Sequence, residues 1–313
     1  MGTPEFAVET LKALVENDYN VVAVVTQPDK PVGRHQTEMQ PSQVKQYAVA
    51  HGLPVLQPEK MKDPVFIEQL RSYNANLQVV VAFRMLPEVV WAMPEYGTFN
   101  VHAALLPQYR GAAPINWAVI NGETQTGVTT FFLDHDIDTG RIILKKTFDI
   151  PDEADVEYVY DGLMHLGAQI CLETLEAIVA ANGHPDSIPQ DSVLDGSAIK
   201  PAPKIFKETC EIDWKKTAKQ VYDFVRGLSP YPGAWTTLVA PDGKETVLKI
   251  YKTRKTGKPG KGIGTITIEG KALCVSAADE QLEIVELQLA GKKRMMARDF
   301  LNGMKQIEDY RVK

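Results

Sequence analysis

Short apolar runs alternate with helical patterns over the first 150 residues, and this alternation constrains the fold more than any other feature. Runs rich in β-branched residues occur at 20–26, 77–83, 97–102 and 127–133. They are too short for stable helices and are typical of buried strands. Helix-start signals occur at Thr3-Pro4, Pro41-Ser42 and Asp63-Pro64. The pattern predicts an α/β fold with a Rossmann-like, mostly parallel sheet, whose ligands bind at the carboxyl ends of the strands.

The first residues fit this pattern badly. Gly2-Thr3-Pro4 has the composition of the turn that follows a first strand, yet only Met1 precedes it. If a central strand were missing, its neighbours would keep unpaired backbone groups in the core, each costing on the order of 1–3 kcal/mol. We therefore expect the native product to begin a few residues upstream of Met1.

The second half of the chain is organised differently. Apolar positions between residues 155 and 181 keep helical spacing and predict one long packing helix. The next segment, 183–204, contains four prolines and two glycines, the composition of a linker. Beyond it, a helical pattern precedes four short alternating segments that are typical of a small β-barrel. We therefore expect domains at 1–182 and 205–313, joined by a linker at 183–204.

Charge is distributed unevenly along the chain. From Lys204 onward there are 21 Lys and Arg against 14 Asp and Glu, a net charge of +7. The residues before it carry 13 against 26, a net charge of −13. A basic second half suggests an anionic partner such as nucleic acid, although a merely solvated surface has the same composition.

Several classes of protein are disfavoured by what the sequence lacks. It has no run of 18–20 apolar residues and no basic leader before a long apolar run, which favours the cytoplasm. The three cysteines are far apart and form no C-x-x-C pair, and the histidines show no metal-ligand spacing. Neither a G-x-G-x-x-G nor a P-loop motif occurs. We expect no metal, dinucleotide or ATP site.

The densest set of polar residues follows the strand pattern at 97–102. Asn100 and His102 are two residues apart and would point to the same face of a strand, and Asp138 lies in a later polar turn. An amide, an imidazole and a carboxylate at strand ends can converge on a substrate. Taken singly, His102 could instead be a core histidine and Asp138 a turn cap.

These motifs resemble a known family. "NVHAALLPQYRGAAPINWAVINGETQTGVT" followed by "DIDTG" resembles the formyltransferases that use 10-formyltetrahydrofolate. More narrowly, "GTPEFAV", "TQPDKPVGR", "IDW", "VRGLSPYPGAWTTL" and "ELQLAGKKRMMARDFLNG" resemble the methionyl-tRNA formyltransferase family over nearly the whole chain. The resemblance implies formyl transfer from 10-formyltetrahydrofolate to the amino group of methionine on the initiator Met-tRNA, by a monomer that needs no metal.

The resemblance also implies roles for individual residues. Asn100 would donate toward the oxyanion, His102 would move a proton or stabilise that oxygen, and Asp138 would tune the histidine. The folate is expected against two loops, at Phe83, Met85, Leu86, Ala104, Leu105, Leu106 and Pro107. Plain core packing is the alternative for the leucines and Met85. The family usually has Ser where Ala104 stands, so one hydrogen bond of about 0.5–1.5 kcal/mol is lost.

For the polynucleotide, the resemblance implies an oligonucleotide-binding (OB) type barrel with basic residues toward the tRNA backbone, and a loop that inserts near the acceptor stem. The residues expected to bind tRNA are Arg34, Lys252, Arg254, Lys255, Lys292 and Lys293. A lysine-rich strand edge that merely discourages aggregation is the alternative. The chain departs from the family pattern after Arg34, since it reads "HQTEMQ" where members commonly have two lysines.

Two other functions are compatible with the same residues. A sugar-nucleotide amine formyltransferase would share the first domain, but the basic second half counts against it. A tRNA-binding protein with a degraded active site would explain Ala104 and the altered loop, but Asn100, His102 and Asp138 are intact.

Overall fold

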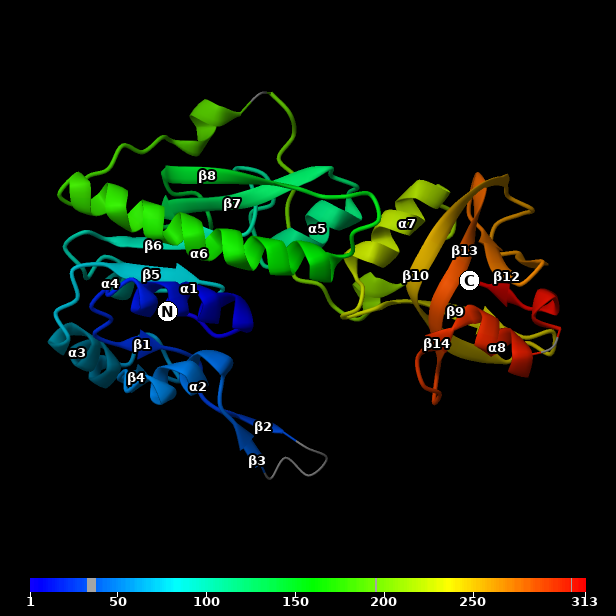
Figure 1. Ribbon diagram of the computed structural model, residues 1–313, viewed down its shortest axis with the longest axis horizontal. Coiled ribbons are helices and arrows are strands. Elements are labelled where there is room, and N and C mark those ends of the chain that lie inside the picture. The colour runs from blue at the N-terminus through cyan, green and yellow to red at the C-terminus, as the bar shows by residue number, and fades with distance from the viewer. Residues whose placement is uncertain (33–37, 195, 305) are drawn as a thin grey trace. The chain divides into compact units, whose positions relative to one another are not determined.

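The computed structural model describes residues 1–32, 38–194, 196–304 and 306–313, and within these the chain forms two compact units (Figure 1). Unit 1 comprises Met1–Gly111, Thr126–Asp149 and Tyr160–Pro201. Unit 2 comprises Ala112–Gln125, Ile150–Val159 and Ala202–Lys313. Two short segments from the first half of the sequence therefore pack with the C-terminal unit, which the domain limits expected from composition do not include.

Unit 1 contains a parallel Rossmann-like region, as predicted. Its strands are β1 (Val24–Val25), β2 (Lys30–Val32), β3 (Glu38–Gln40), β4 (Val55–Leu56), β5 (Gln78–Val81), β6 (Thr98–His102), β7 (Gln125–Phe132) and β8 (Ile142–Asp149). β1 pairs with β4 in parallel, and a separate sheet has the order β5-β6-β7-β8. In that sheet β5 and β6 are parallel, whereas β7 is antiparallel to β6. The parallel sheet thus acquires an antiparallel part, as mixed α/β sheets often do.

The helices of unit 1 begin near the signals found in the sequence. They are α1 (Glu5–Glu16), α2 (Gln43–Ala50), α3 (Pro64–Ser72), α4 (Glu88–Trp91) and most of α6 (Val156–Ala180). The hydroxyl of Ser42 accepts the backbone N–H of Lys45, and the carboxylate of Asp63 accepts that of Val65, so both residues cap their helices.

Helix α6 crosses the sheet of unit 1 (Figure 1). Gly167 lets it approach closely, because a Cβ there would lie 3.2 Å from the ring of Phe6 and 3.4 Å from Val101. By length and composition α6 is apolar enough to cross a membrane. Its Leu163, Ile170 and Ile178 are fully buried in the protein, which is the profile of a core helix.

Unit 2 is built around a curled antiparallel sheet (Figure 1). Its strands are β9 (Ala234–Val239), β10 (Glu245–Pro259), β11 (Ile266–Glu269), β12 (Ala272–Ser276), β13 (Glu280–Leu289), β14 (Met295–Met296) and β15 (Arg311–Val312). The order is β11-β12-β13-β10-β9-β15, with β14 paired to β13. The sheet packs on α7 (Ala218–Gly227) and α8 (Ala297–Gly303), and α5 (Pro114–Ile120) packs on α7. The predicted barrel-type segments are therefore confirmed as strands.

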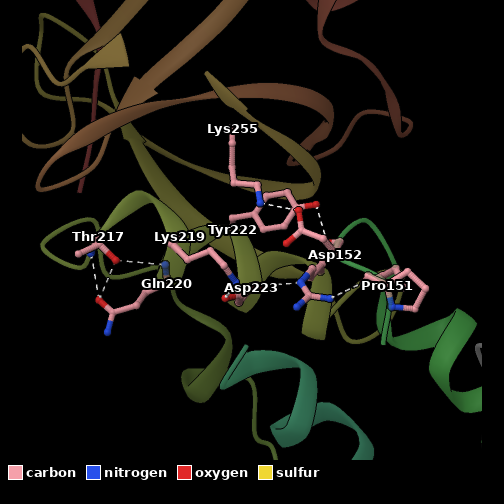
Figure 2. Close-up of polar contacts among 10 residues, drawn as sticks. Pro151, Asp152, Thr217, Lys219, Gln220, Tyr222, Asp223 and Lys255 are labelled. Atoms are coloured by element: carbon pink, nitrogen blue, oxygen red, sulfur yellow. Dashed lines mark hydrogen bonds and ion pairs between the residues drawn. The ribbon is translucent and has the colours of Figure 1, made fainter. Parts of the chain in front are cut away.

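Helix α7 carries a buried ion pair, and Figure 2 shows Asp223 of this pair beside Lys219. Asp223 accepts a hydrogen bond from Arg226 Nε at 2.8 Å and a second from the ammonium group of Lys219. Arg226 Nη1 also donates to the carbonyl oxygen of Ala154 at 2.9 Å. Asp223 and Arg226 are only 4% and 6% exposed. The pair therefore ties the segment before α6 to α7 within the same unit.

Candidate active site

Strand β6 presents Asn100 and His102 at the carboxyl end expected for a site. Asn100 is in register with Val80 on β5 and Phe131 on β7, and His102 is in register with Thr129. His102 is 6% exposed, and Asn100 is half-buried. Within the described part of the chain, Asn100 Oδ1 is buried without a hydrogen-bond partner. An unpaired buried amide oxygen is costly, and because it only accepts, its partner in a substrate would be a hydrogen-bond donor.

His102 is held by the loop that follows it. Its Nε2 lies 2.9 Å from the carbonyl oxygen of Tyr109 and must donate, because a carbonyl only accepts. Nδ1 is therefore the nitrogen left to gain or lose a proton. It lies 3.9 Å from Asp138 Oδ2, a distance for an ion pair rather than a direct hydrogen bond. The structure thus brings His102 and Asp138 together, as the sequence predicted.

Asp138 is positioned by backbone geometry and by one neighbour. It adopts a left-handed conformation with φ 56°, which Asp tolerates better than most residues. Its Oδ2 accepts the backbone N–H of Gly111 at 3.0 Å. The backbone N–H of Gly111 therefore helps to orient the carboxylate toward His102.

Gln190 bonds the turn that carries Asp138 to Arg110, and the sequence patterns did not predict it. Its amide nitrogen donates to the carbonyl oxygens of Asp138 at 2.8 Å and Gly140 at 2.9 Å. Its Oε1 accepts from Arg110 Nε at 3.0 Å and Nη2 at 2.7 Å. Gln190 is 3% exposed although it lies in the segment predicted as a linker. Its Pro-rich surroundings gave no signal of packing.

The segment Ala104–Pro107 follows His102 directly. Ala104 and Leu106 are fully buried, and Leu106 packs with Phe131 and Ile142. Leu105 is half-buried and reaches Gly127, where an added Cβ would lie 2.5 Å from its Cδ2. Pro107 is buried. The side chains expected to contact a folate here therefore serve largely as core, and the backbone is what the segment offers to a ligand.

The second loop expected at the folate, residues 83–87, is more open. Leu86 is buried with Val90 in the core, and Phe83 packs partly against the same cluster. Met85 is 70% exposed. Arg84 stacks on Phe83 at 5.6 Å and donates to the carbonyl oxygens of Glu59 and Pro58, which fixes the loop. Phe83 and Met85 are the side chains of this loop that a ligand could contact.

The basic residues predicted to bind tRNA separate into two groups in unit 2. Arg254 on β10 pairs with Glu283 on β13 at 2.8 Å. Lys255 pairs with Asp152, whose carboxylate raises the pKa of the lysine, and stacks on Tyr222 at 4.7 Å. Two of the predicted cations are thus neutralised within the unit.

The other residues of unit 2 that were predicted to bind tRNA form no ion pair in the described part of the chain. Lys252, Lys292 and Lys293 are exposed, and no ion pair of theirs is found among the residues described. Lys252 lies opposite Glu286, but that carboxylate is already bound at 2.6 Å by Arg294. Arg34 lies outside the described residues. In the same described part, no group of three or more His, Cys, Asp or Glu could hold a metal ion.

Comparison with known proteins gives the class to which these features belong. A family model described as formyl transferase matches residues 1–175, and one described as formyl transferase, C-terminal domain, matches residues 204–305. The chain belongs to the formyltransferase family.

Full-length relatives are more specific. The chain is 59% identical to a methionyl-tRNA formyltransferase of Parabacteroides distasonis, covering 100% of this chain and 97% of that protein. It is 55% identical to a methionyl-tRNA formyltransferase of Bacteroides fragilis, covering 100% and 96%. The resemblance found in the sequence is therefore confirmed.

A solved structure shows the same fold at low identity. The N-formyltransferase of Helicobacter canadensis, in complex with folinic acid and dTDP-3-aminofucose, is 19% identical over 90% of this chain and 96% of its own, with a TM-score of 0.60. At this identity the likeness shows the fold alone.

Proposed function

We propose that this protein transfers a formyl group from 10-formyltetrahydrofolate to the amino group of methionine on initiator tRNA, in the cytoplasm. Identity of 59% to a methionyl-tRNA formyltransferase over the whole chain is the observation that carries the proposal. The exposed Lys252, Lys292 and Lys293 of unit 2 support the proposal, because contacts between basic side chains and phosphates supply most of the affinity for a polynucleotide.

The reaction forms one C–N bond and breaks another. The methionine nitrogen attacks the formyl carbon, the bond from that carbon to N10 of the folate breaks, and one proton moves from the attacking nitrogen to N10. Negative charge gathers on the formyl oxygen in the tetrahedral intermediate. Catalysis therefore needs a donor for that oxygen and a group that relays the proton.

We assign the donor to Asn100 and the relay to His102. The Nδ2 amide of Asn100 would donate to the formyl oxygen, and its unpaired buried Oδ1, which only accepts, would take a hydrogen bond from the attacking amino group. The Tyr109 carbonyl occupies His102 Nε2–H, so Nδ1 carries the proton. The negatively charged Oδ2 of Asp138 faces this nitrogen at 3.9 Å.

The two loops that flank this set form the proposed folate site. The backbone of Ala104–Pro107 would hydrogen-bond the flat pterin, while Leu105, Phe83 and Met85 would supply apolar contact. The chemistry of the segment fits, because folate sites need few polar anchors and a mostly apolar wall. In unit 2 we assign tRNA backbone contacts to Lys252, Lys292 and Lys293, with Arg254 and Lys255 as further candidates. Arg34, which lies outside the described residues, is a further candidate by its resemblance to the family pattern.

The test is formyl transfer from 10-formyltetrahydrofolate to Met-tRNA, free methionine and a 4-amino sugar nucleotide, at two salt concentrations. We expect salt-sensitive transfer to the tRNA alone. His102→Ala should lower kcat by about 10²–10⁴-fold while tRNA affinity is unchanged. His165→Ala is the matched control, because its Nδ1 also lies 3.9 Å from a carboxylate, that of Glu9, but the histidine is 69% exposed.

Each other outcome has a definite meaning. Transfer only to the sugar would assign the protein to sugar-nucleotide formylation. Binding of tRNA without transfer to any acceptor would make it a binding protein with an inactive site. Equal losses in His102→Ala and His165→Ala would remove His102 from the mechanism.

A further inference from the structure

The turn between β7 and β8 carries Asp138 and is largely open to solvent. Residues 134–137 are exposed, and the side chain of Ile137 is 58% exposed. Asp138 nevertheless has a defined geometry, with its Oδ2 at 3.0 Å from the Gly111 N–H and 3.9 Å from His102 Nδ1. An exposed turn has few packing contacts of its own that could hold such a geometry. Its backbone must therefore be fixed from outside the turn.

Gln190 bonds this backbone with a side chain whose hydrogen-bonding groups are all used. Its amide nitrogen donates to the carbonyl oxygens of Asp138 and Gly140, and its Oε1 accepts two hydrogen bonds from Arg110. Glutamine offers two N–H donors and two acceptor lone pairs, so none is left without a partner at 3% exposure. The partners also fix the orientation of the amide, because carbonyls only accept and a guanidinium only donates.

The segment around Gln190 is held on strand β8. Ile188 exchanges two backbone hydrogen bonds with Ile142 of that strand, at 2.8 and 2.9 Å. Val193, the last residue of the 3₁₀ helix that begins at Gln190, packs against the buried cluster that contains Ile142. The glutamine therefore reaches the turn of Asp138 from a position that the sheet fixes.

Arg110, the other partner of the glutamine, lies between the two residues that orient the proposed catalytic groups. The carbonyl oxygen of Tyr109 accepts a hydrogen bond from His102 Nε2 at 2.9 Å. The backbone N–H of Gly111 donates to Asp138 Oδ2. The glutamine amide thus joins the backbone of the turn to the short segment that holds both the imidazole and the carboxylate.

We propose that Gln190 is a positioning residue that fixes Asp138 relative to His102 for formyl transfer. The inference rests on the proposed function, in which the histidine relays a proton and the carboxylate faces it. Gln190 acts through Asp138, because its own bonds go to two backbone carbonyls and to Arg110. A glutamate here would set a carboxylate oxygen against both carbonyls, and a leucine would leave them unpaired. The amide group itself is therefore required.

Steady-state kinetics of Gln190→Leu and Arg110→Ala test this role. A misplacement of about 1 Å can cost about 10²-fold in rate, so we expect kcat of Gln190→Leu to fall by about 10–10²-fold. KM for the formyl donor and for Met-tRNA should stay within about twofold, because the residue contacts neither substrate. Arg110→Ala removes only the donors to Oε1, and its loss in kcat should be smaller.

Gln281→Leu in unit 2 is the matched control. Gln281 is 2% exposed, its Nε2 donates to the Pro259 carbonyl at 2.9 Å, and its Oε1 accepts from Thr267 Oγ1 at 3.0 Å. This variant should lose similar stability and keep its kcat. An equal loss of kcat in Gln281→Leu and Gln190→Leu would overturn the proposal. If Gln190→Leu does not fold, an unchanged kcat in Arg110→Ala would do the same.

Amide exchange at Gly111 tests the positioning without formyl transfer. Its N–H is bonded by Asp138 Oδ2, so its exchange rate reports whether the carboxylate stays in place. Relative to the Leu106 N–H, we expect exchange at Gly111 to accelerate about tenfold in Gln190→Leu and to stay unchanged in Gln281→Leu. An unchanged ratio in Gln190→Leu would contradict the proposal. If the wild-type chain transfers no formyl group, the proposed function fails, while this ratio still decides whether Gln190 positions Asp138.

Discussion

The hydroxyl group of Thr129 donates a hydrogen bond to the carbonyl oxygen of Ala104 at 2.6 Å and accepts the backbone N–H of Leu106 at 3.1 Å. Thr129 is fully buried on β7. From β8, Lys145 Nζ donates to the Leu106 carbonyl at 2.7 Å. Two side chains thus hold three backbone atoms of the segment that follows His102, and they set the position of the proposed folate loop.

Replacing Thr129 should therefore affect activity as well as stability. Thr129→Val keeps the shape but leaves two buried backbone groups unpaired, which costs about 1–3 kcal/mol of folding free energy. The Ala104–Pro107 segment of the proposed folate site would lose the hydrogen bonds that fix its position. We therefore expect kcat/KM for the formyl donor to fall about tenfold, equivalent to about 1.4 kcal/mol. Steady-state kinetics at varied donor concentration measure this change, and Thr129→Ser should restore it.

Thr130→Val is the matched control for this prediction. Thr130 is also fully buried, but its hydroxyl bonds Thr174 of α6 at 2.8 Å and the Leu144 N–H at 3.2 Å. It should lose similar stability and keep its kcat/KM. If both valine variants lose activity equally, the Thr129 hydroxyl has no positioning role.

The enclosed amino group of Met1 predicts a dependence of stability on pH. Burial lowers the pKa of this group to about 6 from 8.0. Between these values the unfolded chain binds a proton that the folded chain does not, so stability rises with pH. For a chain beginning at Met1, we expect about 2 kcal/mol more stability at pH 8 than at pH 6, since each pKa unit corresponds to about 1.36 kcal/mol and the amino group is half-protonated in one of the two states at each limit. Urea unfolding across this range measures it.

Acetylation of the Met1 amino group provides the control for every other group in the chain whose protonation changes with pH. The acetylated chain keeps every side chain but cannot bind that proton, so the difference between the two pH profiles isolates the amino group. Coincident profiles would contradict the prediction.

A single substitution that breaks the buried Asp223–Arg226 pair on α7 should strongly destabilise unit 2. Asp223→Ala leaves Arg226 charged and without its carboxylate at 6% exposure, and we expect a loss of about 3–5 kcal/mol. The double variant Asp223→Ala/Arg226→Met should recover much of that loss, because no unpaired charge remains buried. Guanidinium unfolding followed by tryptophan fluorescence, to which the buried Trp214 of unit 2 contributes, measures both variants. An equal loss in the double variant would contradict this account.

Local patterns predicted the parts of the site that lie on one element. The period of two in a strand puts Asn100 and His102 on one face, and the structure has both on β6. Gln190 could not be predicted in this way. It bonds Asp138 across 52 residues of sequence, and nothing in its own neighbourhood reports that partner.

The charges of unit 2 illustrate the same limit. The sequence shows that Arg254 and Lys255 are basic, but their partners depend on strand register and on a segment that precedes α6. Arg254 meets Glu283 because β10 and β13 are antiparallel in that register, and Lys255 meets Asp152 about a hundred residues away. Charge counted along the chain therefore overstates the charge available to a ligand.

This difference gives a prediction for tRNA binding. The double variant Lys292→Gln/Lys293→Gln removes two exposed cations, and each phosphate that is no longer neutralised reduces the slope of log affinity against log salt by roughly 0.7 to 0.9. We expect the slope to fall by about 1 to 2 while kcat at saturating tRNA is unchanged. The matched control Lys244→Gln/Lys271→Gln removes the same charge from exposed positions outside the cluster and should leave the slope nearly unchanged. Filter binding of Met-tRNA at four salt concentrations compares the two variants. Equal reductions would mean that the net charge of unit 2, rather than the cluster at 292–293, attracts the tRNA.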